Sequence, residues 1–245
     1  MVVIDLKLLK EEAERFGVEL DGTALKKFES FAAMLVDWNS RINLTAITDP
    51  MGIVYKHFAD SLTALAAVDV PIGASFIDVG TGGGFPGLPL LIARPDLNGI
   101  MLDSTKKKLM FVDYCLSKLG LQAQGSTLHM RAEEAGIKLQ LRNHFDFSFS
   151  RAVANLRDLS EYCLPLTKVG GTFVALKGAK AQEEIDEAKA AIKILGGEIV
   201  EVKQLFLSDM GERNIVVIKK VSPTPPKYPR PSAKIAKEPL GMPKN

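Results

Sequence analysis

Hydrophobic positions in the first 70 residues recur every three or four residues, which is the spacing of helices that bury one face. One such stripe lies within residues 25–38, behind Thr23 as a candidate N-cap. Another helix should begin at Asp49, with Pro50 at its first position, and an earlier helix is expected over about residues 6–16. This part of the chain is therefore expected to be all-helical.

From Ser75 onward, short hydrophobic runs alternate with segments of helical pattern. Strands that alternate with helices form a parallel sheet covered on both faces. The last two runs are joined by a connection too short for a crossover helix, so they should pair antiparallel at one edge. The pattern predicts the methyltransferase variant of the Rossmann-like α/β fold: a seven-stranded, mostly parallel sheet with an antiparallel edge strand. The expected strands are 76–79, 100–103, 127–130, 145–150, 172–176, 198–207 and 214–219, and the expected helices are 87–93, 105–119, 155–163 and 180–195.

The clearest chemical signal is the glycine-rich stretch FIDVGTGGGFPG at residues 76–87, where the first strand turns into the first helix of the sheet region. Glycine tolerates positive φ and lets a ligand touch the main chain, so Gly80, Gly82 and Gly84 are candidate cofactor contacts. Asp103 ends the second expected strand, where this fold places a carboxylate against ribose hydroxyls. The turn and Asp103 together predict a site for a nucleoside-containing cofactor.

Two cofactor classes compete for this turn. The stretch contains both D-x-G-x-G-x-G, which starts at Asp78, and the dinucleotide pattern G-x-G-x-x-G, which starts at Gly82. Asp78 stands where the methyltransferase motif has an acid, and Pro86 and Pro89 remove main-chain amides that would bind a pyrophosphate. These features and the preceding helical section favour S-adenosylmethionine, and so a class I S-adenosylmethionine-dependent methyltransferase, over NAD. A purely structural turn is the third interpretation.

Other catalytic classes lack their residues in this sequence. The glycine frame that ends at Gly87 continues with Leu88 and Pro89 instead of Lys-Ser/Thr, which excludes a P-loop nucleoside triphosphatase. No G-x-S-x-G stretch occurs, and the three histidines have no metal-ligand spacing with one another or with the two cysteines. We therefore expect no metal site, and we expect Cys115 and Cys163 to be buried apolar thiols.

Positive charge is concentrated at the C-terminal end, although the formal net charge of the 245 residues is only +2. Residues 222–245 contain 5 Lys and Arg against 1 Glu, together with 7 of the 13 prolines. This composition predicts an extended, solvated basic arm. The expected organisation is a helical section over 1–70, a sheet domain over 71–221 and the Pro-rich tail over 222–245.

Two further features bear on the compartment. No stretch approaches the roughly 18 to 20 apolar residues that span a bilayer. The acid-rich start lacks the basic and apolar regions of a secretion signal. The sequence therefore predicts a cytoplasmic protein with no membrane partner.

Several segments resemble the family of the glucose-inhibited division protein B, also called ribosomal RNA small-subunit methyltransferase G. They follow in order over about residues 25 to 220. One departure is Gly83, where the typical turn of the family has proline. The matching segments are WNSRINLTAI (38–47), HFADSL (57–62), FIDVGTGGGFPGLPL (76–90), MLDSTKKK (101–108), RAEE (131–134), FSFSRAVA (147–154), LKG (176–178) and RNIVVIKK (213–220).

The resemblance implies transfer of a methyl group from S-adenosylmethionine to N7 of one guanine in 16S ribosomal RNA, with the small ribosomal subunit as partner and no role for DNA. Guanine N7 is an unprotonated lone pair, so we expect no catalytic general base, and proximity must supply most of the acceleration. Carried over by position, the cofactor contacts of the family fall on Gly80, Phe85, Ala132, Glu133 and Arg151. Arg151 would orient a cofactor carboxylate or an RNA phosphate, or else form a strand-end ion pair.

Four residues are candidates for the substrate side of the site: Asn43, His57, Lys106 and Arg131. His57 shares a helix face with Asp60 and Ser61, so a hydrogen-bonded junction between the helical section and the sheet is an equal interpretation. Two other functions stay open. One is a small-molecule methyltransferase on the same fold, and the other is a non-catalytic RNA-binding or ribosome-assembly protein. The oligomeric state has no signal in the sequence.

Overall fold

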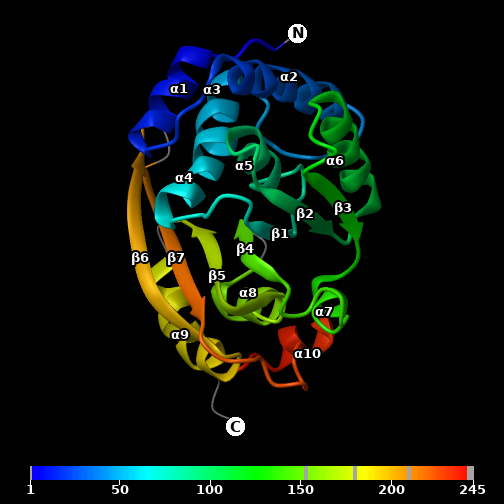
Figure 1. Cartoon of the computed structure of the whole chain (residues 1–245), viewed down its shortest axis with the longest axis vertical. Helices are drawn as coiled ribbons and strands as arrows, with labels where there is room; N and C mark the ends of the chain where they lie inside the picture. The colour runs from blue at the N-terminus through cyan, green and yellow to red at the C-terminus, as the bar shows by residue number, and fades with distance from the viewer. Residues whose placement is uncertain (1, 152–153, 179–180, 209–210, 242–245) are drawn as a thin grey trace.

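Seven β-strands form one central sheet in the order β3-β2-β1-β4-β5-β7-β6 (Figure 1). The computed structural model describes residues 2–151, 154–178, 181–208 and 211–241. Strands β1 to β5 run parallel, and β7 runs antiparallel to both β5 and β6. The predicted antiparallel pairing at one edge is confirmed, with β6 outermost and the reversed β7 beside it. The strands are β1 (Ser75–Val79), β2 (Asn98–Asp103), β3 (Gly125–His129), β4 (Phe145–Arg151), β5 (Thr167–Lys177), β6 (Gly197–Leu207) and β7 (Gly211–Lys220).

Helices cover both faces of this sheet, as the sequence predicts. Side chains alternate along a strand, so neighbouring residues of β1 enter different cores. Phe76 belongs to the core shared with the helices between residues 6 and 118, whereas Ile77 belongs to the core shared with the helices between residues 132 and 194. Among the described residues, no helix has the length and apolar character needed to cross a membrane. The helices are α1 (Leu6–Arg15), α2 (Gly22–Asn39), α3 (Pro50–Gly52), the π-helical η1 (Ile53–Ala59), α4 (Asp60–Ala67), α5 (Gly87–Ala93), α6 (Lys106–Lys118), α7 (Ala132–Ala135), α8 (Leu156–Cys163), α9 (Ala181–Ile194) and α10 (Ser232–Lys237).

The N-terminal helices agree with the sequence pattern except at one cap. Asp49 caps α3 by accepting a 2.7 Å hydrogen bond from the Gly52 amide, as predicted. The N-cap of α2 is Asp21, whose carboxylate accepts from the Ala24 amide at 2.7 Å, so the prediction of Thr23 was wrong. Both side chains can cap a helix, and the structure uses the one that lengthens α2 by two residues.

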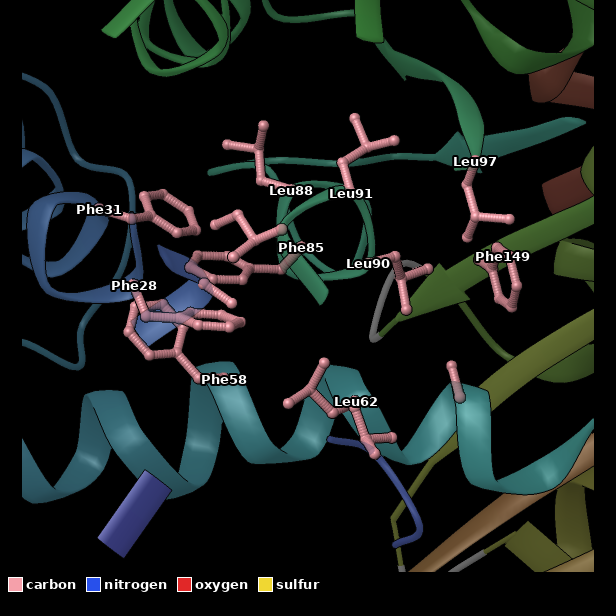
Figure 2. Close-up of a cluster of buried hydrophobic side chains, with 14 of the residues drawn as sticks. Phe28, Phe31, Phe58, Leu62, Phe85, Leu88, Leu90, Leu91, Leu97 and Phe149 are labelled. Atoms are coloured by element: carbon pink, nitrogen blue, oxygen red, sulfur yellow. The ribbon is translucent and has the colours of Figure 1, made fainter. Parts of the chain in front are cut away.

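An aromatic cluster joins the helical section to the glycine turn. Figure 2 shows Phe31 of α2, Phe58 of η1 and Phe85 of the turn with their rings gathered together. The Phe31 ring lies 5.4 Å from that of Phe58 and 5.2 Å from that of Phe85 between centroids, and all three side chains are buried. Aromatic pairs at such distances contribute roughly 0.5–1.5 kcal/mol beyond their buried area. The helical section therefore helps to fix the main chain of the turn.

The C-terminal segment does not form the extended, solvated arm that its composition predicts. It packs beside α7 and α8 and contains a helix of its own, α10 (Figure 1). Thr224, Tyr228 and Ile235 are buried within it. The prediction was wrong because a Pro-rich segment still has carbonyl acceptors, and the half-buried Arg142 of the sheet domain donates to the carbonyls of Thr224 and Tyr228.

The two cysteines are buried and carry free thiols, as the sequence predicts. Burial raises the pKa of both thiols, of Cys163 well above its usual range. At neutral pH both therefore stay protonated and unreactive.

Candidate functional site

A cavity of about 460 Å³ opens at the carboxyl ends of the parallel strands. Strand order reverses between β1 and β4, and this fold binds its ligands outside that point. The wall contains main chain from the glycine turn and side chains that follow β2, β3 and β4. The lining residues are Val79, Gly80, Leu102, Asp103, Ser104, Lys108, Met130, Arg131, Ala132, Glu133, Arg151, Ala154, Tyr162 and Ser232.

The glycine turn has the backbone that the sequence requires. Gly80, Gly82 and Gly84 have φ values of 74°, 57° and 92°, which side-chain-bearing residues rarely adopt. The Gly80 amide donates to the carbonyl of Leu102 at 2.8 Å, so the turn is fastened to β2. Gly80 lines the cavity, whereas Gly82, Gly84 and Phe85 lie outside its lining. The direct contribution of the turn to the cavity is thus the main chain around Gly80.

The side chain of Asp78 stabilises the glycine turn by hydrogen bonds. Its Oδ2 accepts hydrogen bonds from the Thr81 hydroxyl at 2.6 Å and from the Gly87 amide at 2.8 Å. Its Oδ1 is buried and has no partner within the structure. Burial raises the pKa of Asp78 to about 6, against the opposing hydrogen bonds from Thr81 and Gly87. The acid of the motif therefore fixes the two ends of the turn and leaves one oxygen able to accept a further bond.

Asp103 stands at the cavity with both carboxylate oxygens engaged. Its Oδ2 accepts from the Gly82 amide at 2.9 Å, and its Oδ1 accepts from the Thr105 amide at 2.7 Å. The carboxylate is partly exposed and lines the cavity. Each oxygen can accept a second bond, so Asp103 can still receive a ligand hydroxyl.

Arg151, at the end of β4, joins the cavity to the helical section. Its Nη1 donates to Asp60 Oδ2 at 3.1 Å and to the main-chain oxygens of Lys56 and His57 at 3.1 and 3.3 Å. Asp60 is 5% exposed, and its Oδ1 accepts from Arg213 at 2.9 Å. Arg151 therefore lines the cavity, and its guanidinium is held in a fixed orientation by a buried carboxylate that two arginines share.

His57 belongs to this junction and does not line the cavity. Its ring stacks on Phe85 with centroids 4.5 Å apart and an angle of 13°, and its Nε2 lies 2.9 Å from the Thr45 hydroxyl. Burial, followed by the positive charge of Arg151, lowers the pKa of His57 to about 3. A neutral His57 at physiological pH matches the interpretation of a hydrogen-bonded junction.

Replacement of His57 by glutamine is expected to weaken the acid sensitivity of the fold. Because the folded pKa of about 3 lies below the ordinary 6.5, the unfolded chain binds this proton first as the pH falls. Between those values the group lowers the free energy of unfolding by up to about 1.4 kcal/mol per pH unit. Urea titrations of both chains at about pH 7.5 and pH 5 measure this loss. An equal loss of unfolding free energy in the wild type and the variant would contradict the assignment of a lowered pKa to His57.

The cavity gathers most of the predicted cofactor residues and one predicted substrate residue. Gly80, Asp103, Ala132, Glu133 and Arg151 line it, and Arg131 stands at the same wall. Outside the lining, Asn43 lies exposed in the loop after α2, and Lys106 lies exposed at the start of α6.

Eight of the lining residues were given no role from the sequence, and three of these are polar side chains on helices: Lys108, Tyr162 and Ser232. Lys108 belongs to the lysine run of α6, where the sequence does not distinguish the inward member. Tyr162 of α8 and Ser232 of α10 line the cavity from elements far apart in the sequence, so no local pattern marks them.

A larger hollow of about 700 Å³ lies between α1, α2 and the end of α5. It is lined by residues such as Lys10, Asp21, Lys27 and Ile92, away from the glycine turn. No group of three or more His, Cys, Asp or Glu side chains among the described residues could hold a metal ion. The convergent polar groups thus favour the smaller cavity as the functional site.

Comparison with known proteins finds relatives that match nearly the whole chain. A ribosomal methyltransferase of Clostridium beijerinckii, ribosomal RNA small subunit methyltransferase G, is 45% identical over 234 residues, covering 95% of this chain and 98% of the relative. The protein of the same name from an Exiguobacterium species is 47% identical over 225 residues, covering 91% and 94%.

Solved structures show the same fold at low identity. The geranyl diphosphate C-methyltransferase of Streptomyces coelicolor, solved with Mg²⁺, geranyl diphosphate and S-adenosyl-L-homocysteine, superimposes with a TM-score of 0.52 at 11% identity, covering 66% of this chain and 79% of that one.

The family model GidB, rRNA small subunit methyltransferase G, matches residues 24–216. The chain therefore belongs to the rRNA small subunit methyltransferase G family.

Proposed function

We propose that this protein transfers a methyl group from S-adenosylmethionine to N7 of a guanine in 16S ribosomal RNA, in the cytoplasm. Family membership supports an rRNA methyltransferase of the small subunit. The observation that supports a particular site for this activity is the cavity at the strand ends. Its lining includes Gly80, Asp103, Glu133 and Arg151. The choice of guanine N7 follows from the family resemblance.

The residues of the cavity fit S-adenosylmethionine. The carboxylates of Asp103 and Glu133 can accept hydrogen bonds from sugar hydroxyls and from a base amine, and Arg151 can pair with a carboxylate. The open main chain at Gly80 allows close approach of a ligand. A neighbour of the same fold was solved with S-adenosyl-L-homocysteine, the product of that donor. When bound, S-adenosylmethionine supplies an electrophilic methyl group.

The protein then acts by positioning. Guanine N7 has a lone pair available at neutral pH, so the nucleophile requires no proton removal. Arg151 is fixed by Asp60 and would orient the carboxylate end of the donor. Asp103 is fixed by the Gly82 and Thr105 amides and would hold the ribose. Two reactants held in line can account for a large part of the acceleration.

The cations at the cavity wall suggest where RNA approaches. Lys108 and Arg131 line the cavity, and Lys106 and Lys107 are exposed at the start of the same helix as Lys108. Phosphate contacts from such side chains position a nucleic acid without reading its sequence. With a formal net charge of only +2, recognition of a preformed ribosomal surface is favoured over general RNA binding.

The direct test incubates the protein with labelled S-adenosylmethionine and small ribosomal subunits that lack the modification. We expect one labelled nucleotide in 16S rRNA, and cleavage chemistry specific for 7-methylguanine should map it. Label on a different atom of the nucleotide, or on a different RNA, would show that the proposed acceptor is wrong. Absence of any label in RNA, together with measurable donor binding, would favour a small-molecule acceptor or a non-catalytic role.

A further inference from the structure

The C-terminal segment returns to the proposed cofactor cavity after the sheet is complete. We call residues 222–241 the C-terminal strap. It begins after β7, beyond the residues 24–216 that the family model matches. Its helix α10 packs against α8, and Ser232 at the start of α10 lines the cavity beside Tyr162 of α8. The C-terminal strap is therefore part of the site wall.

The first anchor of the strap lies at the end of β7. The fully buried ammonium of Lys220 donates to the Thr224 hydroxyl at 2.7 Å and to the carbonyl of Leu164. The Thr224 hydroxyl in turn donates to the carbonyl of Leu195 at 2.7 Å. Burial, followed by the charge of Arg142, lowers the pKa of Lys220 to about 7. This chain of bonds fixes where the strap leaves the sheet.

The second anchor ties the strap to α7. The Arg142 guanidinium donates to the carbonyls of Thr224 and Tyr228 at 2.7 and 2.8 Å, and to that of Gly136 at 2.7 Å. Gly136 is the C-cap of α7. That four-residue helix carries Ala132 and Glu133 of the cavity wall. One guanidinium therefore couples the strap to a wall helix too short to be stable alone.

The third anchor ties the strap to α8. Arg230 and Glu161 form a two-pronged pair, with 2.9 Å from Nε to Oε1 and 2.7 Å from Nη2 to Oε2. The Glu161 side chain is 1% exposed and that of Arg230 is 13% exposed. Glu161 directly precedes Tyr162, the residue of α8 that lines the cavity. Charge-assisted pairs of this geometry fix orientation as well as distance.

The electrostatics of Tyr162 show how closely these elements meet. Burial, followed by the negative charges of Glu133 on α7 and of Asp158 and Glu161 on α8, raises the pKa of its hydroxyl. Tyr162 therefore stays neutral and can donate a hydrogen bond into the cavity. Both α8, which carries Tyr162, and the neighbouring α7 are bonded to the anchors of the strap.

We propose that the C-terminal strap is a positioning element of the donor site: it fixes the α7 and α8 walls of the cavity through Arg142 and Arg230, and it places Ser232 against the bound donor. The inference rests on the proposed function, because it assigns S-adenosylmethionine to this cavity. It gives the basic tail a role in donor affinity that is separate from any contact with RNA.

The test compares two cavity-directed variants with a matched surface variant. Arg230→Gln removes the pair with Glu161, and Ser232→Trp adds bulk at the cavity while leaving all three anchors in place. Lys234→Trp makes the same addition at an exposed position of the same helix. We expect the Kd for S-adenosylmethionine, measured by calorimetry, to rise about tenfold or more in the first two variants and to stay at the wild-type value in the third.

Two further readouts separate positioning from loss of structure and from RNA binding. Ser232→Trp should keep the wild-type melting temperature and the wild-type Kd for 16S RNA, while the KM for S-adenosylmethionine rises. Wild-type donor affinity in both Arg230→Gln and Ser232→Trp would overturn the strap proposal and leave the proposed function standing. Failure of the wild-type protein itself to bind S-adenosylmethionine would overturn both.

Discussion

Replacement of Gly80 by valine is expected to raise the Kd for S-adenosylmethionine by about a hundredfold or more. Gly80 has φ of 74°, where a β-branched residue is strained, and its main chain forms part of the cavity wall. Relief of that strain must move the wall itself. Calorimetric titration with S-adenosylmethionine measures the change, and circular dichroism reports whether the fold persists.

Gly73 provides a matched control for this substitution. Its φ is 76°, and a Cβ there would meet nothing within 4 Å. Gly73→Val therefore carries the same backbone strain, roughly 1–2 kcal/mol for a left-handed residue, away from the cavity. We expect donor affinity of the Gly73 variant to match the wild type. Equal affinities in the two variants would show that Gly80 has no place in the donor site.

Replacement of Arg151 by alanine is expected to lower kcat/KM for methyl transfer roughly a hundredfold, because one or two charge-assisted bonds to the donor are lost. The fold should survive, since Asp60 keeps the guanidinium of Arg213 as partner. Thermal melting of the variant tests that point, and single-turnover transfer to small ribosomal subunits tests the rate.

Arg213→Ala is the matched control for Arg151. It removes the other guanidinium from the same buried carboxylate, at a residue outside the cavity lining. We expect its loss of transfer to remain below about tenfold. If the two alanine variants lose stability and activity in parallel, Arg151 only forms a structural ion pair with Asp60. The assignment of Arg151 as a contact of the donor would then be wrong.

The fold could be predicted from local pattern because strand and helix periods change sharply at Ser75. The π-helical η1 could not, since a shift from i+4 to i+5 hydrogen bonds leaves the hydrophobic stripe almost unchanged. The cap of α2 was misplaced by two residues because Asp21 and Thr23 are both competent caps.

The residues of the candidate site likewise divide into those that local pattern predicts and those that it does not. Gly80 and Asp103 sit at strand ends, and the topology of a parallel sheet alone brings such positions together. Tyr162 and Ser232 line the same cavity from α8 and from the C-terminal strap, and the Arg142 and Arg230 anchors of the strap join residues about 70 to 90 positions apart in the chain. Pairings at that separation leave no local pattern in the sequence, and the composition of the tail predicted an arm exposed to solvent instead.

The most direct measurement is a crystal structure of the protein with S-adenosyl-L-homocysteine. The ligand should lie in the cavity at the strand ends, with main chain at Gly80, the carboxylate of Asp103 and the guanidinium of Arg151 in contact with it. A ligand seated instead in the hollow between α1, α2 and α5, or a cavity closed by rearranged side chains, would contradict the account.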